Sequence, residues 1–413
     1  MRTRIFCLLL IAVLLLPLFA GCQKREIDAT YQIVYAEDDL YAPFGAKELS
    51  NAFKTVMGES LTVLSASRFD PETADKAIFV GDTGCVEKMP DMEGKDFEVA
   101  VVSEGVVICA KDPMTLFLTC KAISNSLKEN EDGLWGEGNP VFTKSVCKKL
   151  CELSVGTDTM FSVMTQNVRQ GNDGAGKNIA DRKVRLKQLI EDYSPDLLGA
   201  QEVTKEWLEI LRSYFGSEYG IVGCSRDGET AETGEWTPIL YKKDRFQLLD
   251  SGTFWLTDTP NEVSKINGIK YNRICTWALL LDKVTDTEVL YCNTHLDHQS
   301  DEARSQQAKY LLNFLKKYEG QYPIFLTGDF NATTGTTPYR SITAVLSDAH
   351  RKAAADASEV KGTFHDYLTP KQEIDFCFYD EQMADALAYR IQSDDYKGYV
   401  SDHYGVIAYF KYK

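Results

Sequence analysis

Basic side chains are under-represented in this sequence of 413 residues. Lys and Arg number 45 against 61 Asp and Glu, which gives a formal net charge of -16 at pH 7. Proteins that package nucleic acid or bind anionic lipid through charge need clustered Lys and Arg. The shortage excludes a basic DNA-packaging protein. It does not exclude a phosphorylated substrate, since a bound cation can supply the positive charge.

Long apolar runs are scarce, and the clearest one lies at the N-terminus, over residues 5–16 behind Arg2 and Arg4. The run is shorter than the ~20 apolar residues of a membrane-spanning helix. The sequence therefore excludes a multi-span membrane protein and predicts a signal peptide over residues 1–21. The letters LFAGC resemble a bacterial lipobox ending at Cys22, although Phe19 stands where Leu is usual. We expect a monomer that is lipid-anchored outside the bacterial membrane; an ordinary secretory signal with a chance Cys22 is the alternative.

Metal-binding and catalytic cysteine or serine patterns are also absent. The 11 cysteines include no CxxC pair, and the chain has no GxSxG serine elbow. Cys275, Cys292 and Cys377 lie in apolar, strand-like runs, where a cysteine behaves as a small core residue. The sequence therefore predicts neither a zinc site nor a disulfide framework.

The first part of the chain, residues 31–127, has the pattern of a small α/β domain. Apolar residues recur at helical spacing over 46–56, and Gly58 follows as a candidate C-cap. The further expected strands and helix are 61–64, 76–80, 97–109 and 114–127. This segment resembles the accessory domain ahead of the catalytic barrel in some β-hexosaminidases and α-glucuronidases. Acidic and glycine-rich letters after it predict a linker over 128–155.

The remaining part, residues 156–413, alternates many strand-like runs with few helices. Helices are expected at 179–193, 204–215 and 301–318, the last with Ser300 as its N-cap. This ratio disfavours a doubly wound parallel sheet. It favours an α+β fold in which two packed sheets form a β-sandwich with helices outside.

Polar residues gather near the ends of the strand-like runs of this second part; most follow an apolar run, whereas Asp375 sits inside one and Asp402 and His403 precede the last one. The letters are MTQN, GAQE, THLDH, TGDFN, IDF and SDH. Strand ends on one rim of a sandwich can converge although they are far apart in sequence. Acids, amides and imidazoles gathered in this way have the composition of a hydrolase site with an oxygen-ligated metal.

In this order, the motifs resemble those of the endonuclease/exonuclease/phosphatase superfamily, the fold of DNase I. The resemblance implies a four-layer αββα catalytic domain over 156–413 and an Mg²⁺-dependent phosphoric ester hydrolase, with Mn²⁺ as the alternative cation. The metal ligands that it implies are Asn167, Glu202 and Asp402. The other roles that it implies are water orientation by Asp329, a phosphate contact by Asn331 and by Arg273, carboxylate support of His403 by Asp375, and carboxylate support of His295 by Glu235.

Other interpretations of these residues stay open. The stretch GNDGAGKN over 171–178 nearly fits a phosphate-binding P-loop, but Asn178 replaces the required hydroxyl residue, so we expect a flexible loop near the site. The acid, amide and imidazole set favours an extracytoplasmic phosphoesterase, with the choice between phosphodiester and phosphomonoester open. The alternative is a non-catalytic surface lipoprotein that binds glycans or other ligands.

Overall fold

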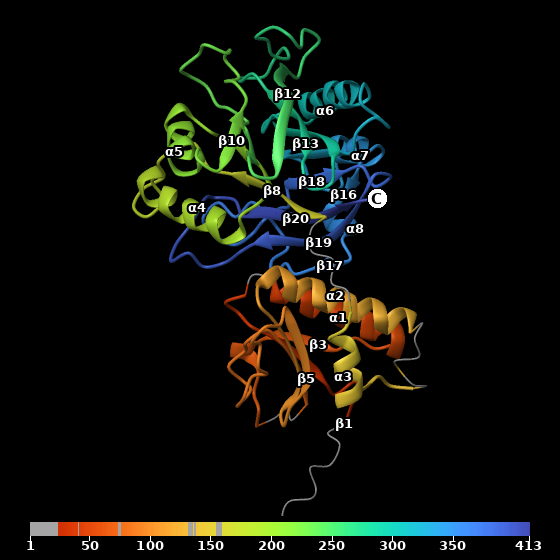
Figure 1. Cartoon of the computed structure of the whole chain (residues 1–413). Helices are drawn as coiled ribbons and strands as arrows, with labels where there is room; N and C mark the ends of the chain where they lie inside the picture. Colours follow the sequence, from red (N-terminus) through yellow and green to blue (C-terminus); the bar gives the residue numbers. More distant parts are fainter. Residues whose placement is uncertain (1–23, 40, 73–75, 131–134, 136–137, 154–158) are drawn as a thin grey trace, which may run out of the picture. The chain divides into compact units, whose positions relative to one another are not determined.

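The computed structural model describes residues 24–39, 41–72, 76–130, 135, 138–153 and 159–413. The predicted signal peptide and the lipobox ending at Cys22 lie outside these residues. The chain divides into two compact units, residues 1–157 and 158–413 (Figure 1). None of the helices in the described ranges combines the length and the apolar composition of a bilayer-spanning segment.

The first unit is built on one mostly parallel sheet. Its strand order is β3 (Thr62–Ser65), β2 (Gln32–Tyr35), β4 (Ala77–Val80), β6 (Gly105–Ala110) and β5 (Phe97–Val101), of which β5 alone is antiparallel to its neighbour. Helices α1 (Ala42–Met57) and α2 (Pro113–Glu129) lie side by side (Figure 1). The expected C-cap is confirmed, since Gly58 follows α1 with a φ of 82°. The single strand expected over 97–109 is instead the hairpin of β5 and β6.

The prediction of a linker over 128–155 was wrong for much of that range. It contains β7 (Val141–Thr143), which pairs with β1 (Lys24–Glu26), and α3 (Lys144–Leu150). Phe142 and Leu150 are at most 1% exposed and belong to the core of the first unit. The acidic, glycine-rich letters before β7 suggested a linker. The few apolar side chains of β7 and α3 are buried by tertiary contacts, which the local sequence does not show.

The second unit contains two sheets, and the predicted α+β sandwich with helices outside is confirmed. One sheet has the order β10 (Tyr219–Val222), β11 (Ile239–Lys242), β9 (Leu197–Gln201), β8 (Met160–Asn167), β20 (Gly405–Tyr412), β19 (Ala384–Gln392) and β17 (Ala355–Asp356). The other has the order β12 (Phe246–Trp255), β13 (Ile274–Asp282), β14 (Thr287–His295), β15 (Ile324–Asp329), β18 (Asp375–Tyr379) and β16 (Ser347–Asp348).

Buried aromatic and aliphatic side chains from both sheets form the core of the sandwich. Phe161 and Phe410 of one sheet contact Phe325 of the other, with ring centroids 4.9–5.1 Å apart for the cross-sheet pairs. Helices α4 (Ile179–Tyr193) and α5 (Lys205–Phe215) lie on one side of the sheets, and α6 (Asp301–Leu315) and α7 (Thr337–Thr343) on the other (Figure 1). The expected N-cap of α6 is confirmed, because the Ser300 hydroxyl accepts a hydrogen bond from the Ala303 N–H at 3.1 Å. Cys275, Cys292 and Cys377 are fully buried in strands, as expected.

Candidate active site

Strand register brings three of the predicted residues into one row at the edge of the second sheet. His295 ends β14 and pairs with Asp329, which ends the parallel strand β15. Asp329 in turn pairs with Asp375, which begins the antiparallel strand β18. Chain reversal between β15 and β18 therefore places an imidazole and two carboxylates beside one another.

The first sheet contributes the other half of the site at the same rim. Asn167 ends β8 and pairs with Gln201 of the parallel strand β9, so Glu202 follows directly at the edge. Glu202 has a φ of 57°, a left-handed backbone conformation that turns the chain away from the strand. Asp402 and His403 come just before β20, which is antiparallel to β8. Backbone positions alone thus bring six segments of the chain to one rim.

These side chains line a cavity of about 390 Å³. Of the predicted residues, the cavity is lined by Glu202, Glu235, Arg273, His295, Asp329, Asn331, Asp402 and His403. Asn167 and Asp375 lie behind it and are hydrogen-bonded to residues of that lining. The structure therefore brings all of the predicted site residues together.

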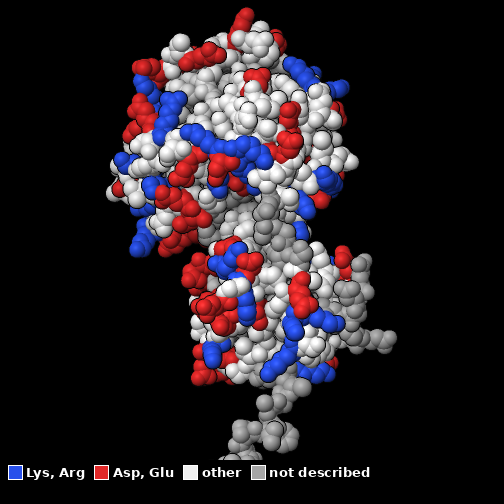
Figure 2. Space-filling model, in the orientation of Figure 1, with Lys and Arg blue, Asp and Glu red and all other residues white. Residues whose placement is uncertain are grey.

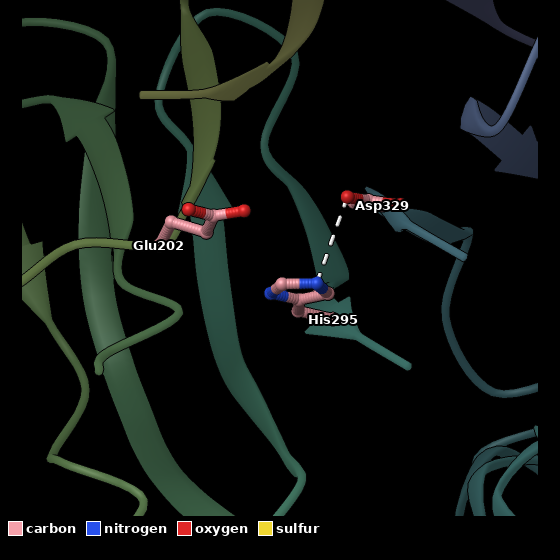
Figure 3. Close-up of side chains that lie close together, drawn as sticks. All are labelled: Glu202, His295 and Asp329. Atoms are coloured by element: carbon pink, nitrogen blue, oxygen red, sulfur yellow. Dashed lines mark ion pairs between the residues drawn. The ribbon is translucent and has the colours of Figure 1, made fainter. Parts of the chain in front are cut away.

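The acidic part of the site gathers carboxylate oxygen atoms around the Asn167 side chain, whose own oxygen accepts the Arg169 backbone N–H at 2.9 Å. The Asn167 side-chain amide donates to Glu202 Oε1 at 3.1 Å and to Asp329 Oδ2 at 3.0 Å. Glu202, His295 and Asp329 approach one another within 4.8 Å (Figure 3). Burial, followed by repulsion from the Asp375 carboxylate, raises the pKa of Asp329 to about 7. Crowded carboxylate and amide oxygens with no thiolate among the described lining residues fit a hard cation such as Mg²⁺.

His403 is hydrogen-bonded to a carboxylate through one ring nitrogen and lines the cavity. Its Nδ1 lies 2.8 Å from Asp375 Oδ2, and its Nε2 lies 3.9 Å from Asp329 Oδ2. Burial disfavours the charged imidazole, but Asp375 and Asp329 outweigh burial and raise the pKa of His403 to about 10. The Phe364 ring covers the imidazole at a centroid distance of 5.0 Å. The residue is therefore an oriented imidazolium at neutral pH.

His295 differs from His403 in its environment. Burial, followed by the nearby Arg273 and Arg226 charges, lowers the pKa of His295 well below the ordinary range. Its Nε2 lies 3.0 Å from the Asn331 side-chain amide, which donates to the neutral ring. Its Nδ1 is 4.0 Å from Glu235 Oε2, too far for a hydrogen bond.

The expected pairing of His295 with Glu235 is therefore not made in this structure. The Glu235 carboxylate instead accepts a hydrogen bond from Arg226 at 2.8 Å. Arg226 is a fixed charge, whereas His295 is neutral, so the guanidinium is the stronger partner for the carboxylate. Arg226 could not be recognised from its sequence position, because an isolated arginine in a turn has no recognisable pattern.

Several further lining residues were not singled out from the sequence, among them Arg169, Tyr271 and His298. Arg169 makes a two-pronged ion pair with Asp173 and lies 3.8 Å from Glu202 and 3.7 Å from Asp402. His298 belongs to the THLDH motif, which was the available signal for it. Tyr271 lies two residues before Arg273 and had no signal of its own.

The loop over 171–178 is shaped by a buried arginine rather than by a phosphate. Arg182 is fully buried and donates hydrogen bonds to the carbonyl oxygens of Val168, Arg169, Gly171 and Lys177. Asn178 forms a capping box with Asp181 at the start of α4. The expected flexible loop is therefore tied to the helix that follows it by several hydrogen bonds.

Comparisons with known proteins agree with this geometry. An endonuclease/exonuclease/phosphatase from Bacteroides vulgatus is 34% identical, with a TM-score of 0.58, over 62% of this chain and 100% of that one. A mannosyl-6-phosphatase from Bacteroides thetaiotaomicron is 27% identical, with a TM-score of 0.56, over 60% of this chain and 98% of that one. Nocturnin of Drosophila melanogaster is 24% identical over 48% of this chain, which spans only 33% of Nocturnin. The pattern of the Endonuclease/Exonuclease/phosphatase family matches residues 164–403, and the chain belongs to this family.

Proposed function

We propose that the protein is an Mg²⁺-dependent phosphoesterase that hydrolyses its substrate by direct attack of water. Members of its family are hydrolases that act on phosphate esters. The observation that carries the proposal is one hydrogen-bonded chain, Glu202–Asn167–Asp329, beside the His403–Asp375 pair. It joins the candidate cation ligands to a carboxylate and an imidazolium within one cavity.

Asp329 is the residue that orients the attacking water. Its Oδ1 accepts the backbone N–H of Asn331 at 2.9 Å, and its Oδ2 accepts the Asn167 amide. Both oxygens are thus fixed, and the raised pKa makes this carboxylate a better proton acceptor than an exposed aspartate. A cation held by Asn167, Glu202 and Asp402 would stabilise negative charge on the phosphate oxygens. Mn²⁺ is the alternative occupant of the same oxygen set.

His403 supplies the proton and the positive charge. Asp375 fixes the ring through Nδ1, so the Nε2–H points toward the cavity and can donate to an oxygen of the ester. Arg273 offers a further donor to the non-bridging oxygens, since its Nε has no hydrogen-bond partner among the described residues. The Asn331 amide, by contrast, donates to His295 and to the Leu296 carbonyl oxygen. The chain's own residues therefore orient water, hold the phosphate and donate a proton in one place.

The substrate is proposed to be a small phosphate ester. Basic and acidic side chains are interspersed on the face shown in Figure 2. Long nucleic acids are bound through clustered Lys and Arg, so this distribution favours a smaller substrate. The similar mannosyl-6-phosphatase supports the same choice.

We further propose that the protein is a monomeric lipoprotein of the bacterial cell envelope. The basic start, the apolar run and Ala20-Gly21-Cys22 support this proposal. Replacing Cys22 with Ser should release or misprocess the protein, as followed by membrane fractionation. Unchanged membrane retention of C22S would contradict it.

The catalytic proposal is tested with a panel of phosphate esters, assayed after EDTA treatment and again after addition of MgCl₂ or MnCl₂. Activity should disappear with EDTA and return with the cation. Asp329→Asn should abolish most of this activity, whereas Asp380→Asn, at a turn outside the cavity lining, serves as the matched control. A folded, metal-supplied protein that hydrolyses none of the esters would refute the proposal.

A further inference from the structure

One part of the cavity is cationic and aromatic, in contrast to the acidic part described above. Arg226, Tyr271, Arg273 and His298 are in contact with one another there, and we call these four residues the arginine wall. The Arg226 guanidinium lies 4.5 Å from the centroid of the Tyr271 ring, and Tyr271 lies 6.1 Å from the His298 ring. Arg273 Nη2 is 3.0 Å from His298 Nδ1. The wall is thus one connected unit.

Arg273 has more hydrogen-bonding capacity than its protein neighbours use. It is only 4% exposed, yet its Nε has no hydrogen-bond partner among the described residues. No carboxylate of those residues lies within ion-pair distance of it: the nearby Glu235 is paired with Arg226, and Asp297 and Asp329 act on its charge only from farther away. A buried charge without a counter-ion is costly, so this geometry is typical of a site that completes itself with an anion.

His298 extends the same donor set toward the solvent side of the cavity. Its Nδ1 accepts the hydrogen bond from Arg273, which places the ring proton on Nε2. The residue is exposed and lines the cavity, so this second donor is available to a ligand. Together, Arg273 and His298 offer one full positive charge and several N–H groups beyond those of the cation ligands and His403.

From this arrangement we infer that the substrate is a phosphomonoester of a hydrophilic alcohol, bound as its dianion through Arg273 and His298. This inference rests on the proposed phosphoesterase function and narrows it. A monoester carries nearly two negative charges at neutral pH because its second pKa is about 6. A diester carries only one and needs no additional cationic partner. Water adds to phosphorus, the ester P–O bond breaks, and the alcohol oxygen takes the proton, which yields inorganic phosphate.

The alcohol group has a separate place beside the arginine wall. A second cavity of about 500 Å³ shares Gln170, Arg226, Glu235 and Tyr271 with the first. Its other lining residues are mostly hydroxyl, amide and charged side chains, among them Asn172, Thr204, Lys205, Glu232 and Thr233. Such a lining can hydrogen-bond a polyol such as a sugar, and burying an acyl chain against it would leave polar groups unpaired.

The preference for a monoester over a diester is tested with two esters that have the same leaving group. These are 4-nitrophenyl phosphate, a monoester, and methyl 4-nitrophenyl phosphate, a diester. The Mg²⁺-loaded full chain should hydrolyse the monoester with a kcat/KM at least ~10-fold higher than that for the diester. Arg273→Gln should reduce this preference by at least ~10-fold, and Arg273→Lys, which retains the charge, should retain part of it. His298→Gln, at an exposed position, tests the same donor set if Arg273→Gln does not fold. Arg212→Gln, at an exposed residue of α5, is the matched control.

The alcohol class is tested with a hexose 6-phosphate against octyl phosphate, of which the sugar ester should be hydrolysed faster. Equal or better hydrolysis of the diester, or an equal loss of both activities in Arg273→Gln and His298→Gln, would overturn the monoester inference. Faster hydrolysis of octyl phosphate would overturn the alcohol class. If no ester is hydrolysed by folded, metal-loaded protein, the proposed function itself fails, which is a distinct outcome.

Discussion

His350, in the helix α8 (Ala349–Lys352), contacts Glu373 in the segment that leads into β18, and the effect of its replacement on stability can be worked out. Its Nε2 lies 3.2 Å from Asp356, its Nδ1 contacts Glu373, and its ring stacks on Tyr389 at a centroid distance of 4.2 Å. Burial disfavours the charged ring, but its hydrogen bonds to the Asp356 and Glu373 carboxylates outweigh burial and raise the pKa of His350 to about 9. The unfolded chain has the ordinary pKa, about 6.5.

The sign and size of the effect follow from this difference. A histidine whose pKa is raised by folding stabilises the folded state fully below about pH 6.5, and this contribution is lost as the pH rises through about 9. At about 1.4 kcal/mol for each pKa unit, the full shift corresponds to roughly 3 kcal/mol. Asp356 is 39% exposed, so solvent screens part of the interaction. We therefore expect about 1–3 kcal/mol.

Urea unfolding of the wild type and of His350→Gln at pH 6 and pH 9.5 measures this contribution. The free energy of unfolding should fall between the two pH values by about 1–3 kcal/mol more in the wild type than in the variant. Other groups titrate alike in both proteins and cancel in the difference. His298→Gln is the matched control, since no carboxylate of the described residues lies within ion-pair distance of that ring. Equal pH dependence of wild type and His350→Gln would refute the reasoning.

Three further changes test the protein near the site. His403→Ala should lower kcat by at least ~10²-fold, the scale of lost acid–base catalysis, with a native circular dichroism spectrum as the check on folding. Glu202→Gln should raise the Mg²⁺ concentration required for half-maximal activity as well as lower the rate; titration of activity with MgCl₂ measures both. Arg182→Met should destabilise the protein by about 2–4 kcal/mol in urea unfolding, because four loop carbonyl oxygens lose their donor. A kcat of His403→Ala near the wild-type value, an unshifted Mg²⁺ requirement, or an unfolding midpoint of Arg182→Met equal to wild type would each contradict the respective argument.

The polar residues at strand ends were predictable because their signal is local. An apolar run followed by GDFN, or preceded by SDH, indicates a buried strand that reaches a polar rim, and β15 and β20 have these two forms. The caps were local too: Ser300 starts α6 and Gly58 ends α1. Such features depend on a few neighbouring residues, so they can be recognised from the letters.

The ion-pair partner of a given side chain and the strands with a weak sequence pattern could not be predicted, because tertiary contacts decide both. Glu235 was expected to pair with His295, but its carboxylate is hydrogen-bonded to Arg226 at 2.8 Å and lies 4.0 Å from His295. Strand β19 has no clear signal in the sequence, since its alanines favour strands only weakly, yet it lies between β20 and β17 and is almost wholly buried. Phe142, in β7, and Leu150, in α3, likewise belong to the core of the first unit because of tertiary contacts that the local sequence does not indicate.

The charge of the whole chain and the charge of the site have opposite consequences for an anionic substrate. A net charge of -16 repels a phosphate dianion at long range. At physiological ionic strength that repulsion is screened beyond about 8 Å, so the field inside the cavity depends on groups within it. There, Arg273 and the imidazolium of His403 face the anion from within the cavity lining, and the carboxylates beside them are the groups that a cation would neutralise. Anion binding should therefore depend on the loaded cation and on the arginine wall, rather than on the overall acidity of the surface.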